Sequence, residues 1–90
     1  SLDKNDEFTW LEKGKYWLQK KDDEKAIECF NKVITIYSRF TEAWIKKGIA
    51  LINLGKHNEA LQCFNKALEI HPDSSEAREY KEQVLKALGR

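Results

Sequence analysis

One feature constrains the fold of this chain more than any other: the sequence repeats itself with a period of 34 residues. One shift by this period aligns identical residues in the first two thirds of the chain, and a second shift aligns the remainder. A fixed period of this length is typical of proteins built from stacked repeats. The aligned residues are Trp10 with Trp44, Gly14 with Gly48, Ala26 with Ala60, Cys29–Lys32 with Cys63–Lys66, Glu42–Ala43 with Glu76–Ala77, and Leu54–Gly55 with Leu88–Gly89.

The period divides the chain into units. Repeat one covers residues 7–40, repeat two covers residues 41–74, and one further helix, 75–88, caps the carboxy-terminal end. The full length of 90 residues is near the lower limit at which one core stabilises a fold, so we expect a single domain, 1–90.

Each repeat is predicted to contain two helices. Apolar residues recur at spacings of three and four, which makes one apolar stripe along each helix. No segment shows the strict alternation of a half-buried strand. The sequence therefore predicts an all-α fold of antiparallel helix hairpins in tandem. In repeat one the two stripes are Trp10, Leu11, Gly14, Trp17 and Leu18, then Ala26, Ile27, Phe30, Val33, Ile34 and Tyr37.

Small polar residues, glycine and proline mark the expected helix ends. Acidic and amide side chains accept hydrogen bonds at a helix amino terminus, and glycine adopts the positive φ that ends a helix. The predicted signals are Asp22–Asp23 and Asn58 at amino termini, Leu54–Gly55 at a carboxy terminus, a break at Pro72, and a capping box of Asp73 with Glu76 before the last helix.

Glycines recur inside the helices, where glycine costs about 1 kcal/mol relative to alanine. Gly14 and Gly48 occupy equivalent places, which indicates close contact between helices. We expect Ala26 and Ala60 to provide the facing small surfaces and Phe30 and Phe64 to fill the space. Trp10 and Trp44 are predicted core residues, whereas Trp17 is assigned to the core or to a groove.

This pattern resembles the tetratricopeptide repeat family, whose motif is W-x2-L-G-x2-Y, then A-x3-F, then P. Repeat two shows Trp44, Gly48 and Leu51 in the first part of the motif, then Ala60-x3-Phe64 and Pro72. Repeat one matches except that Trp17 and Ser38 replace the tyrosine and the proline. Lys13, Lys47 and Lys81 stand where leucine is usual, and the stem of a lysine can cover apolar surface. The resemblance implies a right-handed solenoid with two full repeats and a capping helix.

Members of the family are mostly adaptors that hold peptides or helices on a concave face, which is formed by the first helix of each hairpin. The resemblance thus implies a protein or peptide partner for this chain. The implied groove contains Phe8, Leu11, Lys15, Leu18, Gln19, Glu42, Ile45, Lys46, Ile49, Ile52, Asn53 and Tyr80, with Glu12, Glu76, Glu79 and Gln83 on the same face.

One subset of the family clamps the carboxy-terminal carboxylates of chaperones with lysines and asparagines. The corresponding positions here are Leu11, Lys15, Lys46, Glu76 and Tyr80. Two lysines alone do not make the clamp, and Glu76 would repel a carboxylate. The sequence therefore argues against a chaperone clamp.

An apolar floor of Leu11, Leu18, Ile45, Ile49 and Ile52 remains, with charges of both signs at the rim. Such a surface suits an amphipathic helix or an extended apolar peptide. Alternatively, it packs against another repeat or a second copy of the chain. The function classes left open are a binding module, a structural or self-assembling solenoid segment, including a weak homodimer, and the non-catalytic arm of a larger enzyme.

Several other functions lack a sequence signal. The net charge of +1 provides no basic field for nucleic acid, and apolar runs such as Ile49–Ile52 are too short for a membrane. No motif indicates a catalytic site, a cofactor or a metal centre, so the chain is predicted not to be an enzyme. Cys29 and Cys63 are expected to be free and buried, as in a reducing cytoplasm.

Overall fold

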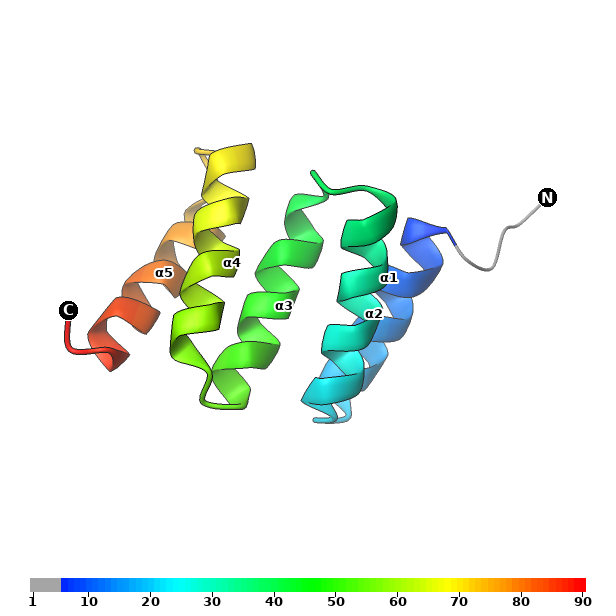
Figure 1. The fold of residues 1–90 in the computed structure, drawn as a ribbon, viewed down its shortest axis with the longest axis horizontal. Coiled ribbons are helices and arrows are strands. Elements are labelled where there is room, and N and C mark those ends of the chain that lie inside the picture. The colour runs from blue at the N-terminus through cyan, green and yellow to red at the C-terminus, as the bar shows by residue number, and fades with distance from the viewer. Residues whose placement is uncertain (1–5) are drawn as a thin grey trace.

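The computed structural model describes residues 6–90 of the chain. This part contains helices and turns and no strand (Figure 1), which confirms the predicted all-α fold. The helices are α1 (Glu7–Gln19), α2 (Asp23–Ile36), α3 (Thr41–Asn53), α4 (His57–Ile70) and α5 (Ser75–Ala87).

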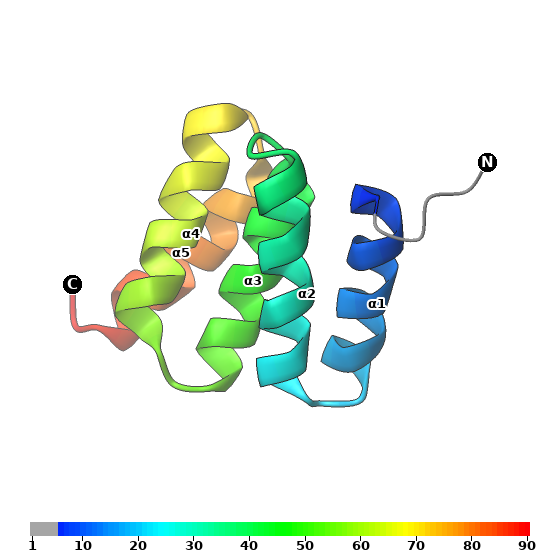
Figure 2. The same cartoon turned by 45° about the vertical axis from the view of Figure 1, so that its right-hand side comes forward.

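The helices form two layers. Each helix packs on the next one along the chain, so α1 with α2 and α3 with α4 make hairpins (Figures 1 and 2). In addition α1 contacts α3 and α3 contacts α5, whereas α2 and α4 do not contact each other. The odd-numbered helices therefore lie closer together and form the inner layer of the stack, with α2 and α4 outside. The result is an elongated body of 47 × 27 × 17 Å.

The two internal glycines allow each hairpin to close. A Cβ atom on Gly48 would lie 2.6 Å from Cζ of Phe64, and one on Gly14 would collide in the same way with the ring of Phe30. Both phenylalanines are fully buried. The absence of a Cβ thus makes room for the ring of the second helix, as the equivalent placement of the glycines predicts.

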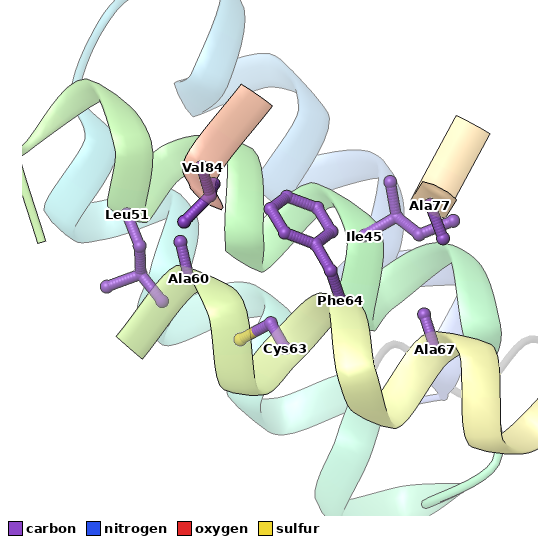
Figure 3. Packing of buried hydrophobic residues seen from close by; sticks show 8 residues of the cluster. All are labelled: Ile45, Leu51, Ala60, Cys63, Phe64, Ala67, Ala77 and Val84. Carbon is purple, nitrogen blue, oxygen red and sulfur yellow. The ribbon is translucent and has the colours of Figure 1, made fainter. Parts of the chain in front are cut away.

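Small side chains lie where successive hairpins meet. The core consists of two hydrophobic clusters. The first contains Leu11, Ala26, Phe30, Val33 and Ala43, and the second contains Ile45, Leu51, Ala60, Cys63, Phe64, Ala67, Ala77 and Val84 (Figure 3). In the second cluster, Ala60, Ala67, Ala77 and the ring of Phe64 are fully buried. Tyr80 of α5 stacks on that ring, with 5.5 Å between centroids and an interplanar angle of 10°. The last helix thus covers the core of the second hairpin.

Two helix ends agree with the sequence. The Oδ1 atom of Asp22 accepts a hydrogen bond from the backbone N–H of Lys25 over 3.2 Å, and this begins α2. Gly55 has a φ of 77° directly after α3, in the left-handed region that glycine favours.

Two other predicted caps are wrong. Asn58 lies inside the first turn of α4, because the backbone N–H of Lys56 already bonds to the carbonyl of Leu51 and the helix restarts at His57. The last helix is capped by Ser74, whose Oγ accepts a hydrogen bond from the N–H of Ala77 over 3.1 Å. Asp73 therefore lies in the preceding turn and forms no capping box.

The prediction that Trp10 and Trp44 are core residues is also wrong in part, since both rings are half-buried at the edge of the hydrophobic clusters. An indole carries an N–H that needs an acceptor, and the edge of the core offers one: Trp44 donates to the carbonyl of Ser38. The ammonium of Lys13 covers the ring of Trp10 at 4.6 Å from its centroid. Trp17 packs against the edge of the first cluster, beneath Lys25.

Candidate functional site

The surface of the inner layer is formed by α1, α3 and α5, and we call it the inner face. Within residues 6–90, α2 and α4 pack on the opposite side of these helices, and no other described helix covers the inner face. The three inner helices begin 34 residues apart, at Glu7, Thr41 and Ser75, so positions separated by 34 residues stand at the same level on successive inner helices. The first such level contains Phe8, Glu42 and Glu76, and each of these side chains is exposed.

Most residues of the predicted groove are accessible, but to different degrees. The exposed ones are polar except for Phe8, and the half-buried ones include the apolar side chains that contact the hydrophobic clusters. The exposed set is Phe8, Gln19, Glu42 and Asn53, and the half-buried set is Lys15, Leu18, Lys46, Ile49, Ile52 and Tyr80.

Leu11 and Ile45 do not belong to the accessible floor. Leu11 is only 4% exposed and belongs to the first hydrophobic cluster, and Ile45 is only 5% exposed and belongs to the second. Neighbouring inner helices approach each other closely here. Leu11 of α1 is therefore buried in a cluster with Ala43 of α3, and Ile45 of α3 is buried in a cluster with Ala77 of α5. The accessible apolar floor therefore consists of Leu18, Ile49 and Ile52.

Polar contacts already occupy some of the predicted groove residues. The ammonium of Lys15 lies 3.2 Å from a carboxylate oxygen of Glu12 and 3.7 Å from one of Glu42. The hydrogen bond to Glu12 and the charge of Glu42 together raise the pKa of Lys15 above its usual value. The side-chain amide of Asn53 donates to Oδ1 of Asp23 over 2.9 Å, so it ties α3 to the start of α2.

The inner face has a hollow at the edge where its helices begin, which we call the upper edge. The hollow lies between the start of α3 and the turn that connects α4 to α5. The sequence places Glu42, Ile45 and Glu76 on this face but does not assign the turn residues to it, although Pro72 and the predicted cap at Asp73 mark the turn. The hollow is lined by Thr41, Glu42, Ile45, His71, Asp73, Ser74, Ser75 and Glu76. A smaller depression continues along α5 over Glu76, Glu79, Tyr80 and Gln83.

An aromatic cluster lies at the other end of the same edge. The ring of Phe8 meets the ring of Phe40 edge to face with 5.8 Å between centroids, and the ring of Tyr37 meets Phe40 at 5.9 Å. Phe8 and Tyr37 are 63% and 51% exposed. Tyr37 and Phe40 flank the turn between α2 and α3. The predicted apolar stripe of the second helix includes Tyr37, whereas Phe40 belongs to no predicted stripe.

The side chains that could ligate a metal ion are dispersed over the described part of the chain. Within residues 6–90, no three His, Cys, Asp or Glu side chains lie close enough to hold a metal ion. Cys29 and Cys63 are free and buried, as predicted, and burial raises the pKa of the Cys63 thiol to about 11. None of the helices described between residues 6 and 90 has the length and apolar character needed to cross a bilayer.

Two family models match the chain in register with its internal period. Both describe the tetratricopeptide repeat, and they match residues 9–40 and residues 41–74. No curated protein matches the chain in a sequence comparison.

Solved structures share this fold. The chain is similar to the TPR domain of Arabidopsis OM64, with a TM-score of 0.89 and 19% identity over 93% of this chain and 69% of that one. It is similar to MamA, with a TM-score of 0.93 and 19% identity over 98% of this chain. The chain spans 52% of that MamA structure. A third similar structure is the second TPR domain of human RPAP3 in complex with an HSP70 peptide, with a TM-score of 0.86 and 23% identity over 91% of this chain and 68% of that one.

Proposed function

Because the chain belongs to the tetratricopeptide repeat family, we propose that it is a protein-interaction module and not an enzyme. In this proposal the inner face binds a peptide or an amphipathic helix of another protein. The proposal places the module in the cytoplasm, which suits its two free thiols.

The observation that carries the proposal is the accessible apolar floor. Leu18, Ile49 and Ile52 are only half-buried, although they contact the hydrophobic clusters. Apolar side chains that remain accessible between polar neighbours are typical of interaction surfaces. The RPAP3 domain of the same fold is complexed with a peptide, which supports this use of the fold.

A clamp for a terminal carboxylate is not part of the proposal. The HSP70 peptide in the RPAP3 complex is SGPTIEEVD, which is acidic at its end. Here the first clamp position, Leu11, is buried, and Lys15 already contacts two carboxylates. Glu76 adds a further negative charge to the same face, so an acidic peptide would meet repulsion.

The proposal is tested by selecting binders from a random dodecapeptide phage library and measuring the affinity of synthetic versions by titration calorimetry. Ile49→Gln places an amide in the apolar floor and should weaken the selected peptides by about tenfold, the effect of losing roughly 1.4 kcal/mol. Ile36→Gln is the matched control, because Ile36 is 46% exposed at the end of the outer helix α2.

Circular dichroism of both variants separates loss of binding from loss of fold. Selection of no peptide, or equal affinity for the parent chain and the folded Ile49→Gln variant, would contradict the proposed function.

A second candidate function is self-assembly through the outer side of α1. Tyr16 supports it, because this ring is 51% exposed where the equivalent residues Ala50 and Val84 are fully buried between hairpins. We propose a weak homodimer on this ground, and its test is given in the Discussion.

A further inference from the structure

The upper edge of the inner face changes its chemistry from one end to the other. At the α1 end lies the aromatic cluster of Phe8, Tyr37 and Phe40. At the α5 end lies the hollow, whose charged lining is acidic. The level that connects them contains Phe8, Glu42 and Glu76, so one helix contributes an aromatic ring and the next two contribute carboxylates.

The aromatic end offers a platform for a flat or apolar side chain. The edge-to-face contacts, at interplanar angles of 73° and 80°, fix the rings of Phe8 and Tyr37 against Phe40. Large parts of Phe8 and Tyr37 nevertheless remain exposed to solvent. Rings held in this way bind with little further loss of conformational entropy, which makes aromatic residues frequent anchors of interfaces.

The acidic end offers a place for a cation. Glu42, Asp73 and Glu76 line the hollow together with His71, and Ile45, which is only 5% exposed, forms a small apolar wall. In the described part of the chain, no Lys, Arg or His lies within ion-pair distance of Asp73, Glu76 or Glu79. Lys15, the cation that contacts Glu42, is shared with Glu12, and Lys46 stands one level below. The methylene stem of an arginine or lysine suits the apolar wall, and its charge suits the carboxylates.

We infer that the partner segment is a peptide with a large apolar or aromatic side chain near one end and an arginine or lysine toward the other. The apolar side chain contacts Phe8 and Tyr37, and the basic side chain enters the hollow between Glu42 and Glu76. This inference rests on the proposed function, and it assigns to the partner a charge opposite to that of the HSP70 peptide bound by the RPAP3 domain.

The experiment uses the dodecapeptides selected as described above, together with versions in which each arginine or lysine is replaced by glutamine. Fluorescence polarisation of the labelled peptides is measured with the parent chain and with the double variant Glu42→Gln, Glu76→Gln. Both carboxylates are exposed, so their removal should leave the fold intact. The matched control is Glu24→Gln, Glu28→Gln, which removes two exposed carboxylates from the outer helix α2.

We expect the selected peptides to be enriched in arginine or lysine together with an aromatic or large aliphatic residue. The double variant at Glu42 and Glu76 should weaken them by about fivefold or more at low salt, because each exposed charge pair contributes a factor of roughly two to five. The glutamine versions of the peptides should lose the same factor with the parent chain and almost nothing with the double variant. Binding should also weaken as salt is raised.

The possible failures are distinguishable. Peptides that bind the inner face but carry no basic residue, or that bind the double variant as well as the control, would overturn this inference and leave the proposed function standing. Selection of no peptide at all would overturn the proposed function itself.

Discussion

The indole N–H of Trp44 donates a hydrogen bond to the carbonyl oxygen of Ser38 over 2.8 Å. The same contact recurs 34 residues later, where the guanidinium of Arg78 donates to the carbonyl oxygen of Pro72 over 3.3 Å. In both cases a side chain in the first turn of an inner helix bonds to the turn that precedes it. Equivalent positions in the period therefore make the same contact to the preceding turn, although the donor is the aromatic side chain of Trp44 in one case and the cationic side chain of Arg78 in the other.

Trp44→Phe should lower the free energy of unfolding by about 1 kcal/mol, because it removes this hydrogen bond and keeps an aromatic ring. Urea denaturation followed by circular dichroism measures the difference. Phe64→Ala provides the reference for a fully buried ring and should cost about 3–5 kcal/mol. An unchanged midpoint for Trp44→Phe would mean that water replaces the indole as donor to Ser38.

Gly48→Ala should destabilise the fold even though alanine is the better helix former. A Cβ at this position lies 2.6 Å from Cζ of Phe64, and overpacking of this kind costs about 1–3 kcal/mol against a gain of about 1 kcal/mol in helix propensity. Thermal and urea unfolding measure the net effect.

The matched control for this substitution is the double variant Gly48→Ala, Phe64→Leu. A smaller side chain at position 64 makes room for the new methyl group, so adding Gly48→Ala to Phe64→Leu should cost less than adding it to the parent chain. Equal costs in the two backgrounds would show that the methyl group and the ring do not collide.

The thiol of Cys63 gives a pH dependence with a defined sign. Burial raises its pKa from 9.0 to about 11, so the unfolded chain loses this proton at lower pH than the folded chain. The associated stability is fully present below pH 9 and is lost as the pH rises toward 11. Stability of the parent chain should therefore fall more steeply over this range than that of Cys63→Ala, as measured by urea denaturation at several pH values. Parallel profiles would contradict the shift.

The parts of the fold that follow the period could be predicted from the sequence. The contacts of Gly14 with Phe30 and of Gly48 with Phe64 form within one hairpin, between residues whose spacing is the same in both repeats. The amino-terminal cap at Asp22 and the glycine after α3 are local as well. Such features depend on a few neighbouring residues, and periodicity identifies those residues directly.

The parts that depend on how hairpins meet could not be predicted in this way. The stripe of apolar residues does not indicate how closely neighbouring inner helices approach, and this distance decides that Leu11 and Ile45 are buried while Ile49 is half-buried. The aromatic cluster joins Phe8 to Phe40, and the equivalent positions one period later hold Glu42 and Ser74, which are not aromatic. Contacts of this kind can be identified only from the three-dimensional structure.

The outer side of α1 leads to the last prediction, a weak homodimer at high concentration. Tyr16 occupies the position that Ala50 and Val84 hold in the following inner helices, where both are fully buried against the preceding hairpin. Its ring instead lies edge to face on Trp17, with 5.0 Å between centroids, and beneath the ammonium of Lys20. The exposed ring of Tyr16, supported by the half-buried ring of Trp17, is available to a second copy of the chain.

Sedimentation equilibrium over a roughly hundredfold range of concentration should show a mass that rises above 10.6 kDa. Tyr16→Glu should keep the mass at 10.6 kDa throughout, because it places a charge where the rings would meet. Phe8→Glu is the control for an alternative dimer through the inner face, since Phe8 is exposed on that face. A parent chain that stays at the monomer mass would contradict the homodimer.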